Sequence, residues 1–467
     1  MRTATPIPTH LLTGRRPARW RTLLVTTAAA LTLTGSAGGI VSAQEATPIP
    51  ADCILIEDGT GCLVTAPESD RVDLAQPTFS NPTAITNPLF PISVQERLVQ
   101  LGVDDGETLR AEASVLPETK TFTIGDQEVE ATISQFVAYG DGRIEEVAVD
   151  YFAQDDAGNV WYFGEDVFNY ENGVVKDNHG SWHAGVDGPP GMIMPANPAV
   201  GDVYRPENIP GFVFEETTVL AIDLTVSGPQ GPITGAIEVL EHGQDDSLET
   251  KVFAPGYGEF SALTGTEYLV AAVSLPVDGL TGTMPTSLDT IATSASDILE
   301  ATPAEDWDEI SAISKLMTTV WDIHEFGGVP PILELSMDSA LEGLTEAVDA
   351  EDAAETRQAT IDVRRAALDL ELQYRSLAYV DLDELALWSD QLTLDAAADS
   401  PAKVSGDVAA METLWARAGA TVDPALAETI GSTLTDLRAA ADAGDLAGAS
   451  ELAARLSEAL ATPDADA

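Results

Sequence analysis

Basic residues are scarce in this 467-residue sequence, where 22 Lys and Arg face 77 Asp and Glu and leave a formal net charge of −55 at pH 7. The acidic residues are spread along the chain in short groups and do not form one acidic tail. Such a surface repels the phosphates of nucleic acids and of anionic lipids, so nucleic acid is excluded as a partner. A salty habitat, whose ions screen self-repulsion, and a bias toward solubility are both open explanations of the acidity.

Catalytic signatures are also missing. The sequence has no Gly-x-Ser-x-Gly elbow, no His-Glu-x-x-His pair, no P-loop and no dinucleotide fingerprint, so no cofactor is expected. Of five histidines, only His179, His183, His242 and His324 lie beyond the first 43 residues. A triad of Ser, His and Asp from separate loops stays open, because geometry and not spacing defines it.

Cysteine is limited to Cys53 and Cys62. The segment between them contains Asp58-Gly59, a hairpin turn signal that lets the two thiols meet. In an oxidising compartment we expect them to form a disulfide. A lipid anchor on Cys53 is the rival interpretation, but Asp52 directly before it argues against an anchor.

The N-terminus is typical of an export signal. Basic residues end at Arg21, an apolar run follows, and the small residues Val41-Ser42-Ala43 precede Gln44. We expect residues 1–43 to be a signal peptide and the protein to be secreted or extracytoplasmic. An uncleaved anchor stays open, because the apolar run approaches membrane-spanning length; no transmembrane helix is expected after removal of the signal.

Two lobes of different pattern are expected after the signal. Residues 44–90 form an extended Pro/Thr-rich leader with the Cys53–Cys62 loop, and residues 91–275 form a β-rich domain. In the latter, Leu220, Ile222, Leu224 and Val226 alternate with smaller or polar residues, which indicates one face turned toward a core. The predicted fold class is α+β by domains, beginning with an antiparallel curved β-sheet or barrel-like domain.

The remainder of the chain is predicted to be an all-α antiparallel helical bundle over residues 302–462, after a linker at 276–301. Thr302-Pro303-Ala304-Glu305 has the pattern of a capping box that begins the first helix. Ser400-Pro401 and Asp423-Pro424 repeat this start, and Gly444 is a stop signal. Arg364 and Arg365 are expected to pair with acids one turn away, namely Asp362 and Asp369.

Several motifs between residues 83 and 262 resemble a family of secreted bacterial β-rich proteins of unknown function. These are Thr86-Asn87-Pro88-Leu89-Phe90-Pro91, Trp161-Tyr162-Phe163-Gly164-Glu165-Asp166, Gly180-Ser181-Trp182-His183-Ala184-Gly185-Val186-Asp187-Gly188, Met194-Pro195-Ala196-Asn197-Pro198, Gly201-Asp202-Val203-Tyr204 and Phe253-Ala254-Pro255-Gly256-Tyr257-Gly258. The resemblance implies export and a β fold but no reaction. At His183 and at residues 168–170 the sequence departs from the family's usual residues.

Two sets of residues are candidate sites. The first, a candidate ligand-binding set, comprises Trp161, Tyr162, Phe163, Trp182 and His183, since aromatic rings stack on sugars or line lipid cavities. Such a cluster is more often the core of a sheet. The second, a candidate copper site, comprises His179, His183, Met192 and Met194, because imidazole and thioether are copper ligands. The competing interpretation places these histidines in exposed turns and both methionines in the core.

The sequence therefore predicts a secreted, non-enzymatic binding or scaffold protein of the cell envelope. The β domain is expected to bind an apolar or envelope-derived ligand, because curved antiparallel sheets often enclose cavities, and the helical bundle to dock a protein partner. One alternative is an extracytoplasmic hydrolase with its site near residues 161–195. Another is a purely structural envelope protein.

Overall fold

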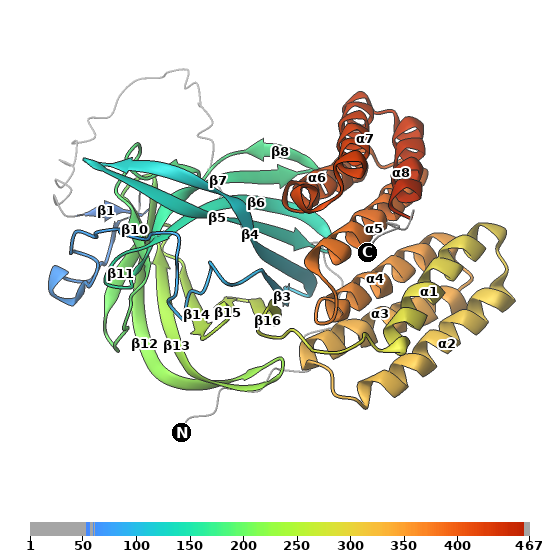
Figure 1. The fold of residues 1–467 in the computed structure, drawn as a ribbon, viewed down its shortest axis with the longest axis horizontal. Coiled ribbons are helices and arrows are strands. Elements are labelled where there is room, and N and C mark those ends of the chain that lie inside the picture. The colour runs from blue at the N-terminus through green and yellow to red at the C-terminus, as the bar shows by residue number, and fades with distance from the viewer. Residues whose placement is uncertain (1–52, 57–58, 60, 462–467) are drawn as a thin grey trace, which may run out of the picture.

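A computed structural model describes residues 53–56, 59 and 61–461. The expected signal peptide at 1–43 lies outside these residues. The described chain forms a large β lobe followed by a helical lobe (Figure 1). Among the described helices, none combines the length and the apolar character needed to cross a membrane. The predicted fold class, α+β by domains with an antiparallel sheet first, is confirmed.

The β lobe is built around one 14-stranded antiparallel sheet. Its strands are β3 (Arg97–Asp104), β4 (Glu107–Ile124), β5 (Gln127–Gly140), β6 (Arg143–Gln154), β7 (Val160–Glu171), β8 (Val174–Asp177), β9 (Trp182–His183), β10 (Gly191–Met194), β11 (Val203–Ile209), β12 (Val213–Gly228), β13 (Gly231–Gly243), β14 (Leu248–Ala254), β15 (Gly258–Thr264) and β16 (Glu267–Leu275). The path runs β10-β7-β6-β5-β4-β3-β16-β15-β14-β13-β12-β11, with β8 and β9 paired to β7. Two runs of neighbouring strands therefore meet at the β3–β16 pair.

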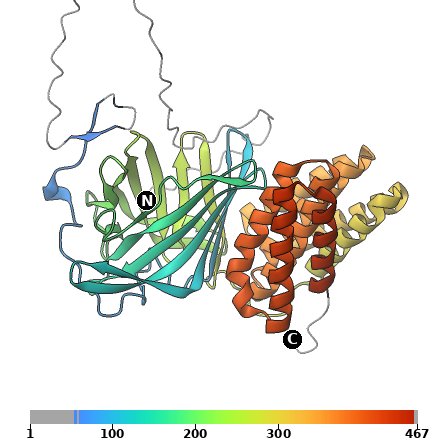
Figure 2. The ribbon, with the colours of Figure 1, turned by 90° about the horizontal axis from the view of Figure 1, so that it is seen from above.

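The sheet curls until its two ends lie against each other, as Figures 1 and 2 show. A Cβ added to Gly191 of β10 would lie 1.8 Å from the carbonyl oxygen of Pro206 in β11. No strand pairing joins β10 to β11 within the described part of the chain, so the sheet is curved but open. We call this junction the seam.

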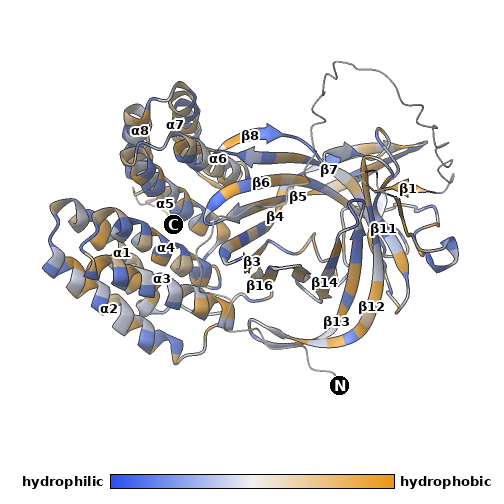
Figure 3. Cartoon of the chain, turned by 180° about the vertical axis from the view of Figure 1, so that it is seen from behind, coloured by the Kyte–Doolittle hydropathy of each residue, from blue (hydrophilic) through white to orange (hydrophobic). Residues whose placement is uncertain are grey.

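The alternation expected along residues 220–226 is only partly realised. Figure 3 shows apolar and polar residues alternating along β12 and β13. However, Leu220 and Ile222 are 42% and 37% exposed, whereas Val226 is buried. Register shifts between Val219 and Leu224 interrupt the pairing with β13, and a bulge changes which face a side chain takes. The prediction that all four apolar residues face one core was wrong.

The two faces of the sheet have different surroundings. Val137 of β5 and Val147 of β6 share a buried cluster with Leu385 of the helical lobe, so this face is covered by helices. Successive strand residues point to opposite faces. Ala148 and Asp150 therefore lie on the other, concave side of the curl, which we call the inner face.

The leader is packed onto the sheet. Strands β1 (Ile54–Leu55) and β2 (Cys62–Leu63) pair with each other, and the Cys53–Cys62 disulfide is present, as predicted. The short helix η1 (Glu68–Asp70) follows. The side chains of Ile85 and Leu89 are buried in the same cluster as sheet residues, so this end of the leader contributes to the core.

Residues 83–95 cross one end of the inner face. The side chain of Gln154, at the end of β6, accepts hydrogen bonds from the backbone amides of Thr86 and Asn87. At the other side, the amide of Gly256, between β14 and β15, donates to the carbonyl of Pro88. The ring of Phe90 lies edge-on to that of Phe152, with centroids 4.9 Å apart. This segment, which we call the plug, fills that end with apolar side chains.

The helical lobe contains eight α-helices among the described residues. They are α1 (Thr286–Ala301), α2 (Trp307–Glu325), α3 (Pro331–Asp349), α4 (Ala353–Glu371), α5 (Leu377–Ala397), α6 (Pro401–Ala418), α7 (Pro424–Ala443) and α8 (Leu446–Leu460), with the short helices η2 (Thr302–Ala304) and η3 (Gly419–Thr421). Helices α1–α4 enclose one buried cluster and α5–α8 another, so two four-helix units stand side by side (Figure 1).

The helical lobe begins earlier than expected. Helix α1 occupies residues 286–301, most of the stretch expected to be a linker. Thr302 caps no helix; its hydroxyl donates to the carbonyl of Ile298 in the turn before. Helix α2 is capped by Asp306, whose carboxylate accepts from the amide of Glu309. The predicted start at Thr302 was therefore wrong.

The later helix boundaries match their signals. Pro401 and Pro424 each open a helix, and the Asp423 side chain accepts from two backbone amides at the start of α7. Gly444 ends α7 with a left-handed backbone, φ 67°. The strongest local signals are thus the proline starts and the glycine stop.

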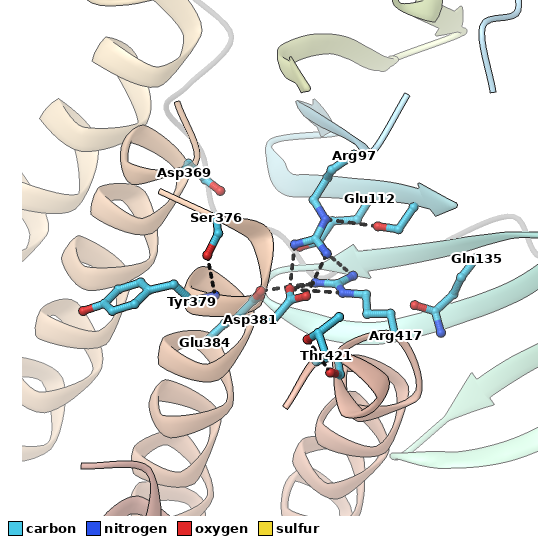
Figure 4. Close-up of polar contacts among 12 residues, drawn as sticks. Arg97, Glu112, Gln135, Asp369, Ser376, Tyr379, Asp381, Glu384, Arg417 and Thr421 are labelled. Carbon is cyan, nitrogen blue, oxygen red and sulfur yellow. Dashed lines mark hydrogen bonds and ion pairs between the residues drawn. The ribbon is translucent and has the colours of Figure 1, made fainter. Parts of the chain in front are cut away.

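Buried ion pairs join the two lobes. Arg417 of α6 lies 2.7 Å from Glu112 of β4, and Arg97 of β3 lies 2.7 Å from Asp381 of α5. Arg417 also lies 3.2 Å from Asp381, so two guanidinium groups converge on one carboxylate (Figure 4). None of these four side chains is more than 5% exposed. Burial alone would raise the pKa of Glu112, but the charges of Arg417 and Arg110 hold it well below its usual value.

Two further sheet arginines extend this network. Arg110 of β4 lies 2.7 Å from Asp369 of α4, and Arg143 of β6 lies 2.6 Å from Asp395 of α5. Asp369 therefore pairs across the lobe interface and not with Arg365 of its own helix. The local pairing expected for Arg364 and Arg365 was wrong in this respect.

Replacing Arg417 with Met should destabilise the protein strongly, because Glu112 and Asp381 would each lose a buried cationic partner. We expect a loss of about 3–5 kcal/mol in the free energy of unfolding, measured by urea denaturation. Arg438→Met is the matched control, since its pair with Glu412 is 27% and 40% exposed. It should cost less than about 1 kcal/mol. Equal effects of the two substitutions would contradict the role given to the buried network.

Candidate functional site

The aromatic candidates lie in the core. Trp161, Phe163 and Trp182 are 4%, 0% and 1% exposed, and Tyr162 is 8% exposed. Tyr162 stacks on Phe152 of the inner face, whereas Phe163 packs against Phe122 and Phe79. Strand alternation thus divides the Trp-Tyr-Phe run between the two faces, and it forms no single aromatic surface.

His183 belongs to a polar cluster on the outer face. Its Nε2 atom lies 3.0 Å from Asp166 and 3.1 Å from the ammonium of Lys120. The Tyr151 hydroxyl donates to the same Asp166 carboxylate, and Lys120 lies 3.9 Å above the Tyr151 ring. Burial opposes the charge of Asp166, but the Tyr151 bond and Lys120 hold its pKa below the usual value. Nothing in these contacts supplies a nucleophilic hydroxyl to the imidazole.

The four candidate copper ligands have unlike surroundings. Met192 and Met194 are 2% and 0% exposed and belong to the main core of the sheet. His179 is exposed, and the contacts of its backbone are with Asp177 and Asn169. Among the described residues, no three His, Cys, Asp or Glu side chains are close enough together to hold a metal ion.

A row of carboxylates lines the inner face, which we call the acidic row: Asp150, Glu165, Glu207, Glu215 and Glu241. Asp150 lies directly opposite Glu165 in the β6–β7 pair, and Glu207 lies opposite Glu215 in the β11–β12 pair. Directly opposed residues share a face of the sheet. Trp182 of β9, opposite Glu165, donates its indole N–H to Glu207 at 2.9 Å across the seam. The row therefore crosses the seam, from β6 and β7 near one end of the sheet to β11, β12 and β13 near the other.

Hydrogen bonds hold the row in place. The Tyr162 hydroxyl donates to Asp150 at 2.7 Å. Glu165 and Glu207 lie close enough to share a hydrogen bond when one of them is protonated, as do Glu215 and Glu241. A bond between two carboxyl groups requires one proton between them. The row consequently carries less than its full negative charge whenever these pairs form.

The pKa values agree with that arrangement. Burial raises the pKa of Asp150, Glu207 and Glu215 each to about 7. Burial and then the nearby carboxylates push the pKa of Glu165 and Glu241 well above the usual value. The row thus exchanges protons near neutral pH, and it attracts cations once its carboxyl groups have lost their protons.

Lys251 is the one basic side chain that the described structure places in ion pairs at this row. Its ammonium lies 2.7 Å from Glu241, 3.3 Å from Glu259 and 3.5 Å from Glu249. No ion pair links Asp150, Glu165, Glu207 or Glu215 to a basic residue in the described part of the chain. Four carboxyl groups of the inner face therefore have no ion-pair partner in the described part of the chain.

Two shallow hollows lie elsewhere, near the junction of the lobes. One, of about 280 Å³, is lined by Gln230, Ile233, Tyr257 and Asp278 among others, and the other, of about 260 Å³, by Ser93, Glu96 and Leu377. Asp278 is already occupied by the Tyr257 hydroxyl and the Ser274 amide. Neither hollow gathers charges as the acidic row does, so we take the row as the candidate site.

A scan against protein-family models and a search of the curated proteins both return no match to this chain. The resemblance to the secreted β-rich family therefore stays a prediction from the motifs. The function is inferred from the site alone.

The acidic row was not anticipated from the sequence. In the sequence, Glu146, Ala148 and Asp150 alternate with Val147, Val149 and Tyr151, and the polar face of such a strand is ordinarily the one that meets water. The signal that could have found the row is the recurrence of acids at every second position on neighbouring strands. Reading it requires the strand registers, because 77 acidic residues offer too many combinations.

Stability should depend on pH through the row. Because the folded pKa of Asp150, Glu207 and Glu215 is raised, the folded state holds protons that the unfolded state releases between about pH 4.5 and 7. The stabilisation is present at the lower end of this window and is lost as the pH rises through 7. We expect the urea midpoint to fall from pH 5 to 7.5.

The double variant Glu207→Gln, Glu215→Gln should flatten this decline. Its control is Glu128→Gln, which removes an exposed carboxylate on β5. A decline of the same steepness in the double variant would show that other groups cause it.

Proposed function

We propose that this is a non-enzymatic binding protein that acts outside the cytoplasm and holds its ligand on the inner face of the sheet. One observation carries the proposal: the inner face bears partly exposed carboxyl groups with no cationic partner. A face that served only as core would be apolar, because buried unpaired polar groups are unfavourable. The plug and the rings of Phe152 and Tyr162 supply an apolar floor beside these groups.

These two kinds of lining modify the expectation of an apolar ligand. An amphiphile with an apolar part toward the plug and a polar part toward the acidic row fits better than a purely apolar molecule. An envelope component of that character remains compatible. We also propose that the helical lobe serves as a rigid platform for a protein partner, since the buried ion pairs attach it firmly to the sheet.

Export is part of the proposal and is supported by the disulfide, which persists in oxidising compartments. Protein collected from the medium of a secreting host should have a denatured mass that starts at Gln44 and is two hydrogens below that of the reduced chain. Native mass spectrometry of the same sample should show extra mass that is lost on denaturation. A native mass equal to that of the bare chain would contradict the binding function.

The hydrolase alternative is favoured by one contact, the Asp166 carboxylate beside His183. If the protein were a hydrolase, activity on ester or glycoside substrates should disappear in His183→Ala and persist in His242→Ala, whose imidazole pairs with Asp246 at the surface. Absence of turnover with wild-type protein would exclude these substrate classes. A purely structural role predicts neither turnover nor bound mass.

A further inference from the structure

The acidic row is accompanied by two hydroxyl groups that have nothing to bond. Tyr204 is 1% exposed and Thr217 is 0% exposed, and neither hydroxyl has a hydrogen-bond partner in the described structure. Buried hydroxyls without partners are unfavourable and uncommon in native proteins. They therefore indicate that something else completes this part of the face.

Their position connects them to the row. Tyr204 lies opposite Thr217 in the β11–β12 pair, and Thr217 lies opposite Glu241 in the β12–β13 pair. After burial, the nearby charges of Glu241 and Glu215 are what raise the pKa of Tyr204. The two unpaired hydroxyls and the carboxyl groups thus belong to one surface.

Lys251 shows which chemical group this surface accepts. Its ammonium sits among three carboxylates at 2.7–3.5 Å, on strands β13, β14 and β15. On the other side of the row, Asp150, Glu165 and Glu207 are arranged on β6, β7 and β11 without such a partner. A ligand ammonium would take there the place that Lys251 takes on its side.

The spacing of the carboxyl groups favours an extended cation over a metal ion. The row is distributed over five strands, and no group of three His, Cys, Asp or Glu side chains among the described residues is arranged to hold a metal ion. A linear amine with several ammonium groups matches charges spread in this way. Its methylene segments suit the apolar lining, since Phe136 and Ala148 lie opposite each other on the same face as Asp150.

We propose that the inner face binds a linear aliphatic polyamine, with one ammonium at Asp150, Glu165 and Glu207 and another near Glu215 and the hydroxyls of Tyr204 and Thr217. This inference rests on the proposed binding function and names its ligand class. A terminal ammonium donates three N–H bonds and an internal one donates two, and together they satisfy the unpaired carboxyl oxygens and hydroxyls.

Spermidine is the probe for this site, used with the full mature chain in isothermal titration calorimetry at 0.15 M salt. We expect saturable binding that Glu165→Gln, Glu207→Gln weakens at least tenfold. The matched control Asp126→Asn, Glu128→Gln removes two exposed acids at the β4–β5 hairpin, one in the turn and one at the start of β5, and should leave the affinity unchanged. Equal weakening by both pairs would reduce the binding to general attraction by an acidic surface and overturn the proposal.

Tyr204→Phe gives an independent test because it keeps the ring and removes only the hydroxyl. With no partner to lose, the apo protein should keep or raise its thermal midpoint, while spermidine affinity falls several-fold. Unchanged affinity would remove Tyr204 from the site. If spermidine fails to bind although native mass spectrometry shows another bound molecule, the ligand class is wrong and the binding function stands. If neither binds, both fail.

Discussion

The relation between the two lobes depends on the buried pairing of Arg417 with Glu112, and of Arg97 with Asp381. Charges taken out of water are tolerated only when each one meets its opposite at close range. Four arginines and six carboxylates meet at the interface, with the contributions of the sheet and helices interleaved. Sliding one lobe over the other would leave several charges unpaired at once. The interface therefore specifies one arrangement.

The use of arginines at the lobe interface leaves few basic residues for the inner face, because the chain has only 22 Lys and Arg. Arg97, Arg110, Arg143 and Arg417 are committed to the lobe interface. The inner face keeps Lys251, and its other carboxyl groups lie beside one another or accept from Tyr162 or Trp182. Thus the buried acids between the sheet and the helices find their cationic partners within the protein itself. The inner face retains an affinity for cations from outside.

Local features were predictable to the extent that short-range physics determines them. Alternating apolar residues and turn signals identified the antiparallel sheet, the cysteine spacing identified the disulfide, and the prolines at 401 and 424 marked helix starts. The helix start predicted at Thr302 was wrong because the Thr302 hydroxyl donates to the carbonyl of Ile298, four residues earlier, and so caps no following helix. The division of the helices into two four-helix units depends on which apolar stripes meet, and no single helix carries that information.

The site was less predictable because the registers between strands determine which acidic residues become neighbours. Asp150 and Glu207 are far apart in the sequence and become neighbours of the same surface only when the sheet curls. Conversely, the conspicuous Trp161–Phe163 run is divided by alternation and buried. The aromatic residues, which are rare and conspicuous in the sequence, thus form the core. The acids of the row, which are common in the sequence, form the face whose carboxyl groups lack cationic partners.

The open seam gives the sheet a mechanical property. The ring of strands is hydrogen-bonded everywhere except between β10 and β11, with the β3–β16 pair near the middle of the path. At such a junction the curvature of a sheet can change through small changes of twist in many strands, without the loss of a strand pairing. Glu165 of β7 and Glu207 of β11 stand on opposite sides of the gap, so like charges on them weaken the contact between the two ends, and a shared proton or a bridging cation strengthens it. How closely the two ends of the sheet meet therefore depends on the protonation of these two carboxyl groups.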